Sequence, residues 1–462
     1  MKLNWKALAV VFSASAIALS ACGGSSTGGT STSAAASSDT ASSSASASAP
    51  ASESASASAA GFDPCAATHP APPRGGGEKY IVYMTALNIG NSWQEEAENL
   101  GMAVAQMPPY NACVEARKEL TDPDPTKQIS QLQSMVDAGA DGITSYALSP
   151  TAINAAYKDA CGQGVTIVVY DATATAPCVY NVSYITSVPT LPDGSPAAHP
   201  FMGYNAMDGL LKLMGNKGDI FVSHGVVGTS TDIVHYGSAL AALKNDSPST
   251  KILTEYEGKW DSAQQLKETT KALAAFPNVA GIFCGYGEPG CVKALKAAGK
   301  TIPVSGETSN YFRQQLLKGW PGISVGSPPA QGGIGMKVLL HVVLVGPAGV
   351  PHDIEVPYTI VTKDNVKECT GNTATAGCNV FPDGTVGDEE TADIFNPMLP
   401  EASLTGAHSG AADAGAIATA YTAEYLAGFE QDPSRRFITR AACPSGWVEG
   451  DLPENVKGCV KG

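Results

Sequence analysis

The sequence predicts an α/β protein whose folded part consists of two lobes, each built on a parallel sheet covered by helices. From residue 78 onward, short β-type apolar runs alternate with amphipathic stretches of helical length. Strict alternation of strands and helices favours parallel sheets sandwiched between helices. Two successive sets of strands flank the proline-rich stretch Ser187–Pro200, which indicates two lobes.

The expected elements follow in chain order. The strands are runs of apolar residues short enough to cross a sheet: Tyr80–Thr85, Cys113–Leu120, Gly142–Tyr146, Val165–Tyr170, Asp219–Ser223, Lys251–Tyr256, Gly281–Cys284 and Ile302–Ser305. The helices between them are amphipathic: Ser92–Gln106, Pro125–Ala138, Ala152–Ala160, Met207–Met214, Val234–Lys244, Ser262–Ala275 and Gly290–Ala298.

Composition excludes several classes of protein. Of 462 residues, 44% are apolar and 15% are charged, so the chain can bury a large core and is not a charge-rich disordered protein. The net charge of -15 argues against a nucleic-acid partner, which would be held by neutralising phosphates. Eleven cysteines without a CxxC pair point to an oxidising compartment outside the cytoplasm.

The N-terminal part is expected to export and tether the folded part. Residues 1–21 carry Lys2 and Lys6 before a short apolar run, the pattern of a cleaved signal peptide. Leu19-Ser20-Ala21-Cys22 resembles a bacterial lipobox, which implies cleavage before Cys22 and lipid attachment to its sulfur. Residues 22–61 form a Ser/Ala-rich linker that cannot bury enough apolar surface to fold.

Polar residues follow most of the predicted strands. In open parallel sheets, ligands bind beyond the carboxyl ends of the strands, so these segments predict the site. Hydroxyl, carboxamide and carboxylate groups together with aromatic faces suit a neutral polyhydroxylated ligand. The segments are Asn88–Trp93, Ser145–Ser149, Asp171, Gly225–Asp232, Gly258–Asp261, Gly285–Glu288 and Glu307–Asn310.

The stretch from Tyr80 to about Val366 resembles the type I periplasmic solute-binding proteins of bacterial ABC importers, in the ribose-binding-like sugar branch. The resemblance rests on segments in the order of that family: Tyr80–Met84 with Asn91–Trp93, Gln128–Tyr146, Gly164–Asp171, Gly228–Ser230, Trp260-Asp261 and Thr359–Val366. It implies a first lobe at 78–200 completed by about 328–356, and a second at 201–327 completed by about 357–366. Hinges are then expected near 201–204, 327–329 and 357–359, and residues 367–462 are an extension without an assigned role.

The resemblance also implies a set of ligand-binding residues: Asn91, Ser92, Trp93, Asp171, Trp260, Tyr286, Glu307, Asn310 and Ser327. Two departures from the family pattern make ribose itself doubtful. Ala172 stands where the family has an arginine, and 231–236 contains no arginine to donate forked hydrogen bonds. The residues also have structural interpretations: Trp93 as core packing, Asp171 as a helix N-cap and Trp260 as a surface aromatic.

Besides Cys22, ten cysteines remain, an even number consistent with five disulfides. Connectivity cannot be derived from the sequence, but pairing of sequence neighbours fits the loops that these residues bracket. The suggested pairs are Cys65–Cys113, Cys161–Cys178, Cys284–Cys291, Cys369–Cys378 and Cys443–Cys459.

These expectations combine into an exported, lipid-anchored, monomeric binding protein that closes on a sugar or polyol and presents it to an ABC permease. We expect neither enzymatic activity nor a cofactor or metal. One alternative is a receptor that signals to a membrane partner. Another is an exported dinucleotide-binding enzyme, because Gly285–Gly290 matches GxGxxG. The acidic residues Asp383, Asp388, Glu389 and Glu390 indicate a solvated loop rather than a calcium site.

Overall fold

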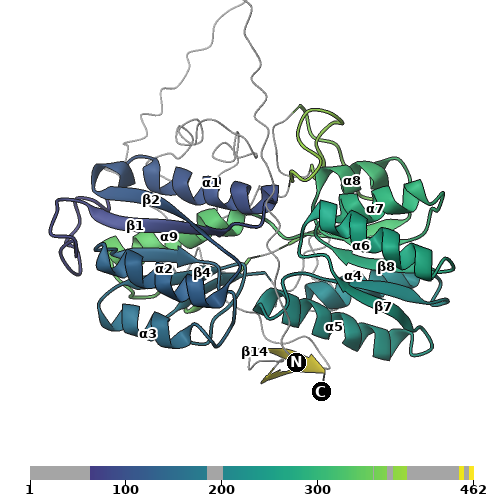
Figure 1. Cartoon of the computed structure of the whole chain (residues 1–462). Coiled ribbons are helices and arrows are strands. Elements are labelled where there is room, and N and C mark those ends of the chain that lie inside the picture. Colours follow the sequence, from purple (N-terminus) through teal and green to yellow (C-terminus); the bar gives the residue numbers. More distant parts are fainter. Residues whose placement is uncertain are drawn as a thin grey trace, which may run out of the picture. The chain divides into compact units, whose positions relative to one another are not determined.

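The computed structural model describes residues 63–184, 201–356, 358–371 and 378–392, and the backbone of strands at 447–451 and 457–461. Within these ranges the chain forms two six-stranded sheets, each flanked by helices (Figure 1). This confirms the predicted α/β class and the presence of two lobes. The expected signal peptide, Cys22 and the linker lie outside the described residues, as does 411–429, a stretch whose sequence is typical of a helix.

The first lobe is built on an all-parallel sheet with the strand order β11-β5-β4-β3-β1-β2. The strands are β1 (Tyr80–Leu87), β2 (Val114–Thr121), β3 (Gly142–Ser145), β4 (Thr166–Tyr170), β5 (Tyr180–Ser183) and β11 (Asp353–Glu355). The helices are α1 (Ser92–Gln106), η1 (Tyr110–Ala112), α2 (Pro125–Asp137), α3 (Asn154–Gly162) and α9 (Ala330–Leu344). Helices α1 and α9 pack on one face of the sheet, and α2 and α3 on the other (Figure 1).

The second lobe repeats this arrangement with the strand order β12-β10-β9-β8-β6-β7, in which only β12 is antiparallel to its neighbour. The strands are β6 (Ile220–His224), β7 (Ile252–Glu257), β8 (Gly281–Gly285), β9 (Val304–Gly306), β10 (Gly322–Val325) and β12 (Ile360–Thr362). The helices are α4 (Met202–Leu213), α5 (Ser230–Asp246), α6 (Ser262–Ala275), α7 (Glu288–Ala297) and α8 (Asn310–Leu317). Near the C-terminus, β13 (Trp447–Asp451) and β14 (Lys457–Lys461) form a separate antiparallel pair.

Burial explains which strands the sequence revealed. The inner strand β4 is apolar and buried because helices cover both faces of the sheet. The edge strands β2 and β7 carry charged residues, which protect an open sheet edge from pairing with another chain. Strands β5, β10, β11 and β12, of three or four residues each, and the pair β13 and β14 were not predicted. Strands β3 and β9 are as short, but each follows a predicted helix in the expected alternation.

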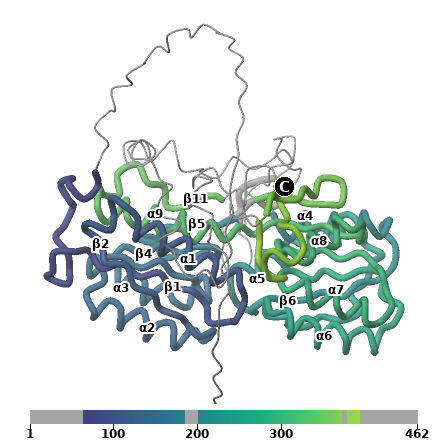
Figure 2. Tube along the Cα trace, turned by 90° about the horizontal axis from the view of Figure 1, so that it is seen from above, coloured from purple at the N-terminus to yellow at the C-terminus, as the bar shows by residue number. Residues whose placement is uncertain are grey.

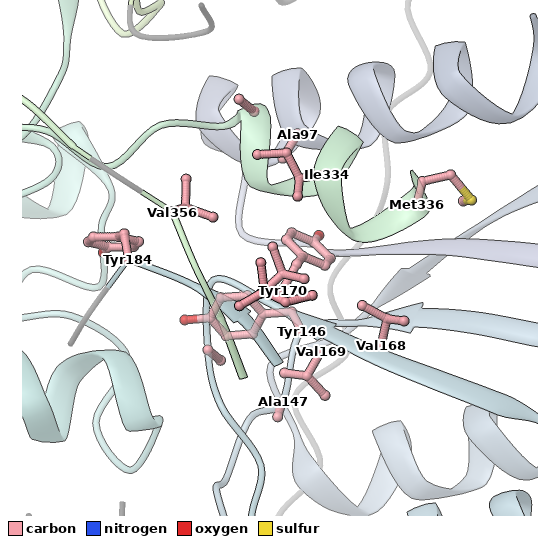
Figure 3. Close-up of a cluster of buried hydrophobic side chains, with 14 of the residues drawn as sticks. Ala97, Tyr146, Ala147, Val168, Val169, Tyr170, Tyr184, Ile334, Met336 and Val356 are labelled. Atoms are coloured by element: carbon pink, nitrogen blue, oxygen red, sulfur yellow. The ribbon is translucent and has the colours of Figure 1, made fainter. Parts of the chain in front are cut away.

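Helix α9 was also missed, for a different reason. Every one of its side chains is buried, so it shows none of the polar and apolar alternation that marks a surface helix. It follows the second lobe in sequence but packs in the first lobe, where it lies with β11 among the purple and blue elements (Figure 2). Ile334 of α9 lies beside Ala97 of α1, above the ring of Tyr170 (Figure 3).

Two helix starts were predicted about a full turn or more too late. Helix α4 begins at Met202 rather than Met207, so 202–204 belong to a buried helix and not to the expected crossover. Helix α5 begins at Ser230 rather than Val234, because the Thr229 side chain accepts a hydrogen bond from the Asp232 amide and caps the helix.

Four of the five suggested disulfides are present: Cys65–Cys113, Cys161–Cys178, Cys284–Cys291 and Cys369–Cys378. Each closes a loop of fewer than 50 residues, in keeping with pairing between sequence neighbours. Cys443 of the fifth suggested pair lies outside the described residues.

No helix within the described ranges combines the length and apolar content needed to cross a membrane.

The contact between α1 and α9 supplies a test of the fold. A Cβ at Gly332 would lie 2.1 Å from the Ala97 carbonyl oxygen, whereas one at Gly335 would lie 3.4 Å from the Tyr170 Cβ. We expect Gly332→Ala to lower the free energy of unfolding by about 1–3 kcal/mol or more, because two backbones must separate. Gly335→Ala should be neutral or stabilising, by up to about 1 kcal/mol of helix propensity. Urea unfolding measures both; equal effects would contradict the tight α1–α9 packing.

Candidate functional site

A small cavity lies where the carboxyl ends of both sheets meet. Its volume is about 20 Å³, room for about one water molecule, so a sugar-sized ligand requires the lobes or side chains to move apart. Every residue that lines it follows a strand or opens the next helix: Asn91, Trp93, Gln94, Tyr146, Asp171, Tyr184, Thr231, Trp260, Tyr286, Glu307 and Ser327. The convergence arises because parallel strands all end at the same edge of their sheet.

Most residues expected to bind ligand come together in this cavity: Asn91, Trp93, Asp171, Trp260, Tyr286, Glu307 and Ser327. Two do not line it. Ser92 contacts a lining residue instead, since its hydroxyl lies 3.2 Å from that of Tyr286. The Asn310 side chain points elsewhere, since its Oδ1 accepts a hydrogen bond of 2.7 Å from the Phe381 amide.

Four lining residues were not singled out from the sequence. Tyr146 and Thr231 lie within strand-end segments that we had marked, but nothing in the sequence distinguished them from their neighbours. Tyr184 follows β5, a strand too short to be recognised. Gln94 is buried and its Oε1 accepts the Leu87 amide at 3.0 Å, so it joins the end of β1 to the start of α1.

Hydrogen bonds join the two lobes across the cavity. Asn91 caps α1 by accepting the Gln94 amide and donates its own Nδ2 to the Trp260 carbonyl at 3.1 Å. The Tyr146 hydroxyl donates to the Thr231 hydroxyl at 3.1 Å. Because each of these bonds ends on a cavity-lining residue, lobe closure and the shape of the site are directly connected.

Asp171 supplies the first of two buried carboxyl groups. It lies in the loop after β4 with a φ of 63°, and no helix begins there, so it is not a helix N-cap. Burial raises its pKa to about 7, although hydrogen bonds with Gln331 and Tyr146 favour the charged form. The Gln331 Nε2 donates to Oδ1 at 3.2 Å.

Glu307 supplies the second carboxyl group from the end of β9. Its Oε1 accepts the Tyr286 amide at 3.1 Å. Burial, followed by the neighbouring charges of Glu288 and Asp171, raises its pKa well above the ordinary value. The ring of His235 lies 3.8 Å away, but burial lowers its pKa to about 4, so it is neutral at pH 7 and brings no positive charge.

The aromatic residues form the remaining wall. Trp260 and the preceding Lys259 both have positive φ angles, a strained conformation typical of functional sites. The Trp260 indole lies against Gly225, where a Cβ would come within 2.0 Å of the ring, and meets Tyr146 edge-on at 6.4 Å. Trp260 is therefore buried and not a surface aromatic. Trp93 both packs in the core and lines the cavity, and its Nε1 donates to the Ser327 carbonyl at 2.6 Å.

The GxGxxG turn has a different structure from a pyrophosphate site. Glu288 opens α7 and is fully buried there, with its Oε1 accepting the Ser309 amide at 3.0 Å. Burial raises the pKa of Glu288 to about 7, and an acidic side chain at this helix N-terminus is unfavourable for a nearby phosphate. Among the described residues, no group of three or more His, Cys, Asp or Glu is arranged to hold a metal ion.

Solved structures of several binding proteins share this fold. An ABC transporter periplasmic solute-binding protein from Actinobacillus succinogenes with bound D-allose is 19% identical and covers 62% of this chain and 98% of its own, with a TM-score of 0.52. A Caulobacter myo-inositol binding protein is 18% identical and covers 64% and 96%, with a TM-score of 0.53. At these identities the likeness concerns the fold.

The sequence comparisons identify the family. A xylitol-binding protein of Mycolicibacterium smegmatis is 24% identical over 250 residues, which is 53% of this chain and 67% of that protein. A family model described as the periplasmic binding protein domain matches residues 82–346, more than half of the chain. These residues include β1, α9 and nearly all the strand ends that form the cavity. The chain therefore belongs to the family of periplasmic binding protein domains.

Proposed function

We propose that this protein is the extracytoplasmic substrate-binding component of an ABC importer and that its ligand is a small neutral sugar or polyol. The observation that supports this most directly is the cavity itself, which has two buried carboxyl groups and five aromatic rings but no Lys or Arg. Such a lining disfavours phosphate or carboxylate ligands. It suits hydroxyl groups, which donate to carboxyl oxygens, and C–H faces, which pack on aromatic rings.

The relatives support the same class of ligand. Their names and bound molecules are xylitol, D-allose and myo-inositol, all uncharged and rich in hydroxyl groups. They are binding proteins, which favours transport over the exported dinucleotide enzyme, and the buried Glu288 at the GxGxxG turn adds a physical argument. Capture then proceeds by closure: the ligand contacts both lobes only in the closed form, and its binding shifts the population toward the form presented to a permease.

The lipid anchor completes this proposal. Cleavage before Cys22 and lipidation of its sulfur would hold a monomeric binding protein at the outer face of the cell membrane, with residues 22–61 as a flexible tether. Mass spectrometry of the protein from the membrane fraction tests this step. The expected result is an N-terminal Cys22 carrying acyl chains, and an unmodified Cys22 would contradict the anchor.

The function itself is tested with a ligand panel. We expect the unfolding temperature to rise with one pentitol, aldose or cyclitol and to stay unchanged with NAD⁺ or sugar phosphates, because a ligand of the native state stabilises it. With the ligand so found, Asp171→Asn should weaken binding by about 10–100-fold, corresponding to about 1.5–3 kcal/mol for a hydrogen bond to a charged group. Isothermal titration calorimetry measures the affinity.

Asn is chosen at this position because it tolerates the positive φ of Asp171. Asp137→Asn makes the same change on the surface of the same lobe and should bind like the wild-type protein. If Asp171→Asn bound the ligand as tightly as the control, Asp171 would not be a ligand-binding residue.

Asp171 also predicts a pH dependence of stability in the absence of ligand. Its pKa of about 7 in the folded protein exceeds the ordinary value near 4, so its contribution favours the folded state at low pH and is lost as pH rises through about 7. Between pH 6 and 8, the wild-type free energy of unfolding should therefore fall more steeply than that of Asp171→Asn. The difference is at most about 1.4 kcal/mol per pH unit for one proton. Urea unfolding at pH 6, 7 and 8 measures it, and equal slopes would show that Asp171 titrates normally.

A further inference from the structure

The segment 378–392, which we call the strap, lies beyond the last strand of the second lobe and returns toward the cavity. The Cys369–Cys378 disulfide fixes its start. Main-chain and side-chain bonds then hold it along α8. Arg313 donates to the Asn379 carbonyl at 2.8 Å, and Gln314 donates to that of Phe381 at 2.6 Å. The strap is therefore an anchored part of the second lobe.

Asn310 explains how the strap is held near the site. Its side-chain Oδ1 accepts a hydrogen bond from the main-chain N–H of Phe381 at 2.7 Å. Its main-chain N–H donates to the Glu390 carbonyl at 2.7 Å. This residue, which the resemblance assigned to ligand binding, thus connects α8 to both halves of the strap. An ion pair of 2.7 Å between Lys293 of α7 and Asp388 adds a surface contact.

The strap touches the wall of the cavity through Tyr286. The Tyr286 hydroxyl donates to the Glu389 carbonyl at 2.8 Å and lies 3.2 Å from the hydroxyl of Ser92 on α1. A phenol bonded on one side to the strap and on the other to the first lobe has little freedom to rotate. The strap therefore determines where a ring that lines the cavity is placed.

The end of the strap contacts the first lobe directly. The Thr391 amide donates to Oε1 of Glu96 at 3.2 Å, and Glu96 belongs to α1. Both residues have an exposed fraction of 0%, and that of Glu390 is 5%. A main-chain hydrogen bond to a buried carboxyl oxygen is shielded from water, so it stabilises more than a surface contact would.

The second oxygen of Glu96 reveals the chemistry of this contact. Oε2 is buried and has no hydrogen-bond donor among the described residues. Glu390, the residue before Thr391, is also buried, which brings a second carboxyl group to this contact, and two carboxyl groups can bond only by sharing a proton. Burial, then Glu390 and the nearby Glu95, raises the pKa of Glu96 well above its ordinary value; the charged groups acting on it are all acidic.

We propose that the strap is an interlobe latch, in which a proton shared between Glu96 and Glu390 joins α1 to the second lobe and holds the closed cleft and the Tyr286 phenol in place. Glu96 is a positioning residue in this device, since it lines no part of the cavity. The latch acts through closure and needs no bound ligand.

The sign of its pH dependence follows from burial. Opening the lobes exposes Glu96 to water and returns its pKa to the ordinary range, so the closed form binds this proton more tightly than the open form. The shared proton therefore stabilises the closed form fully below about pH 4.5. This stabilisation is lost as the pH rises through the raised pKa of Glu96 in the closed form. Once Glu96 has lost this proton, the shared hydrogen bond is gone and the strap is released.

Substitutions of Glu96 separate the latch from a general effect on folding. Glu96→Gln keeps an acceptor for Thr391 and gains an N–H donor for Glu390, so it reproduces the protonated pair at every pH. Glu96→Leu fills a similar volume without hydrogen bonds. Glu78→Gln makes the same charge change at an exposed position of the first lobe, just before β1, and serves as the control.

The measurement is amide hydrogen exchange of the full chain without ligand, at pH 5.5 and 8.0, expressed as protection factors that remove the intrinsic effect of pH. In the wild type and in Glu78→Gln, protection of 386–392 and of the start of α1 should fall about 3–10-fold between the two pH values. Glu96→Gln should stay protected at both, and Glu96→Leu should be unprotected at both. Protection of β3 and β4 reports whether the first lobe remains folded.

A wild-type response to pH that persists unchanged in Glu96→Gln would overturn the proposal, even if Glu96→Leu does not fold. The same holds if the strap is equally protected at both pH values in the wild type. Because no ligand is present, either result concerns the latch alone, and the ligand panel decides the proposed function separately.

Discussion

Two carboxyl groups buried without a positive charge are the constraint on which the site depends. Asp171 and Glu307 have exposed fractions of 5% and 4%, and no Lys or Arg lines their cavity. Buried carboxyl groups must find hydrogen-bond donors or take up protons. Gln331, Tyr146 and the Tyr286 amide supply some of those donors. In the proposed function, the hydroxyl groups of a bound sugar or polyol supply the others.

Glu96 is a further buried carboxyl group, and it lies outside the cavity. There a carboxyl group is buried beside a second one, and its donors come from the strap and not from a ligand. The two places are joined through Tyr286, which lines the cavity and bonds to the strap. Because the strap is anchored to α8 and α7 and contacts α1, it adds a bond between the lobes beyond those made by Asn91 and Tyr146. Closure in this protein therefore depends on both the ligand site and the segment that follows the family domain.

The relatives share the fold and leave the pocket chemistry to the individual chain. The family model ends at residue 346, whereas β11, β12 and the strap lie beyond it. Strand β12 completes the second sheet, and the strap adds contacts for Asn310 and Tyr286. Where the resemblance implied an arginine donor, Ala172 is buried and apolar, and no Lys or Arg lines the cavity.

Two mostly parallel sheets could be predicted from the sequence alone, because most of the inner strands and the amphipathic helices carry a local pattern of apolar residues, as β4 and α6 show. It also indicated the strand ends that line the cavity, and it suggested five disulfides between sequence neighbours, of which four are present among the described residues. The other elements and the surroundings of single side chains depend on tertiary contacts. Helix α9 is buried on all sides and short strands such as β5 lack a pattern, so neither leaves a periodic signal. The positions of Tyr184, Asn310 and Glu96 depend on contacts between segments far apart in the chain, and no local pattern encodes which distant groups will surround a side chain.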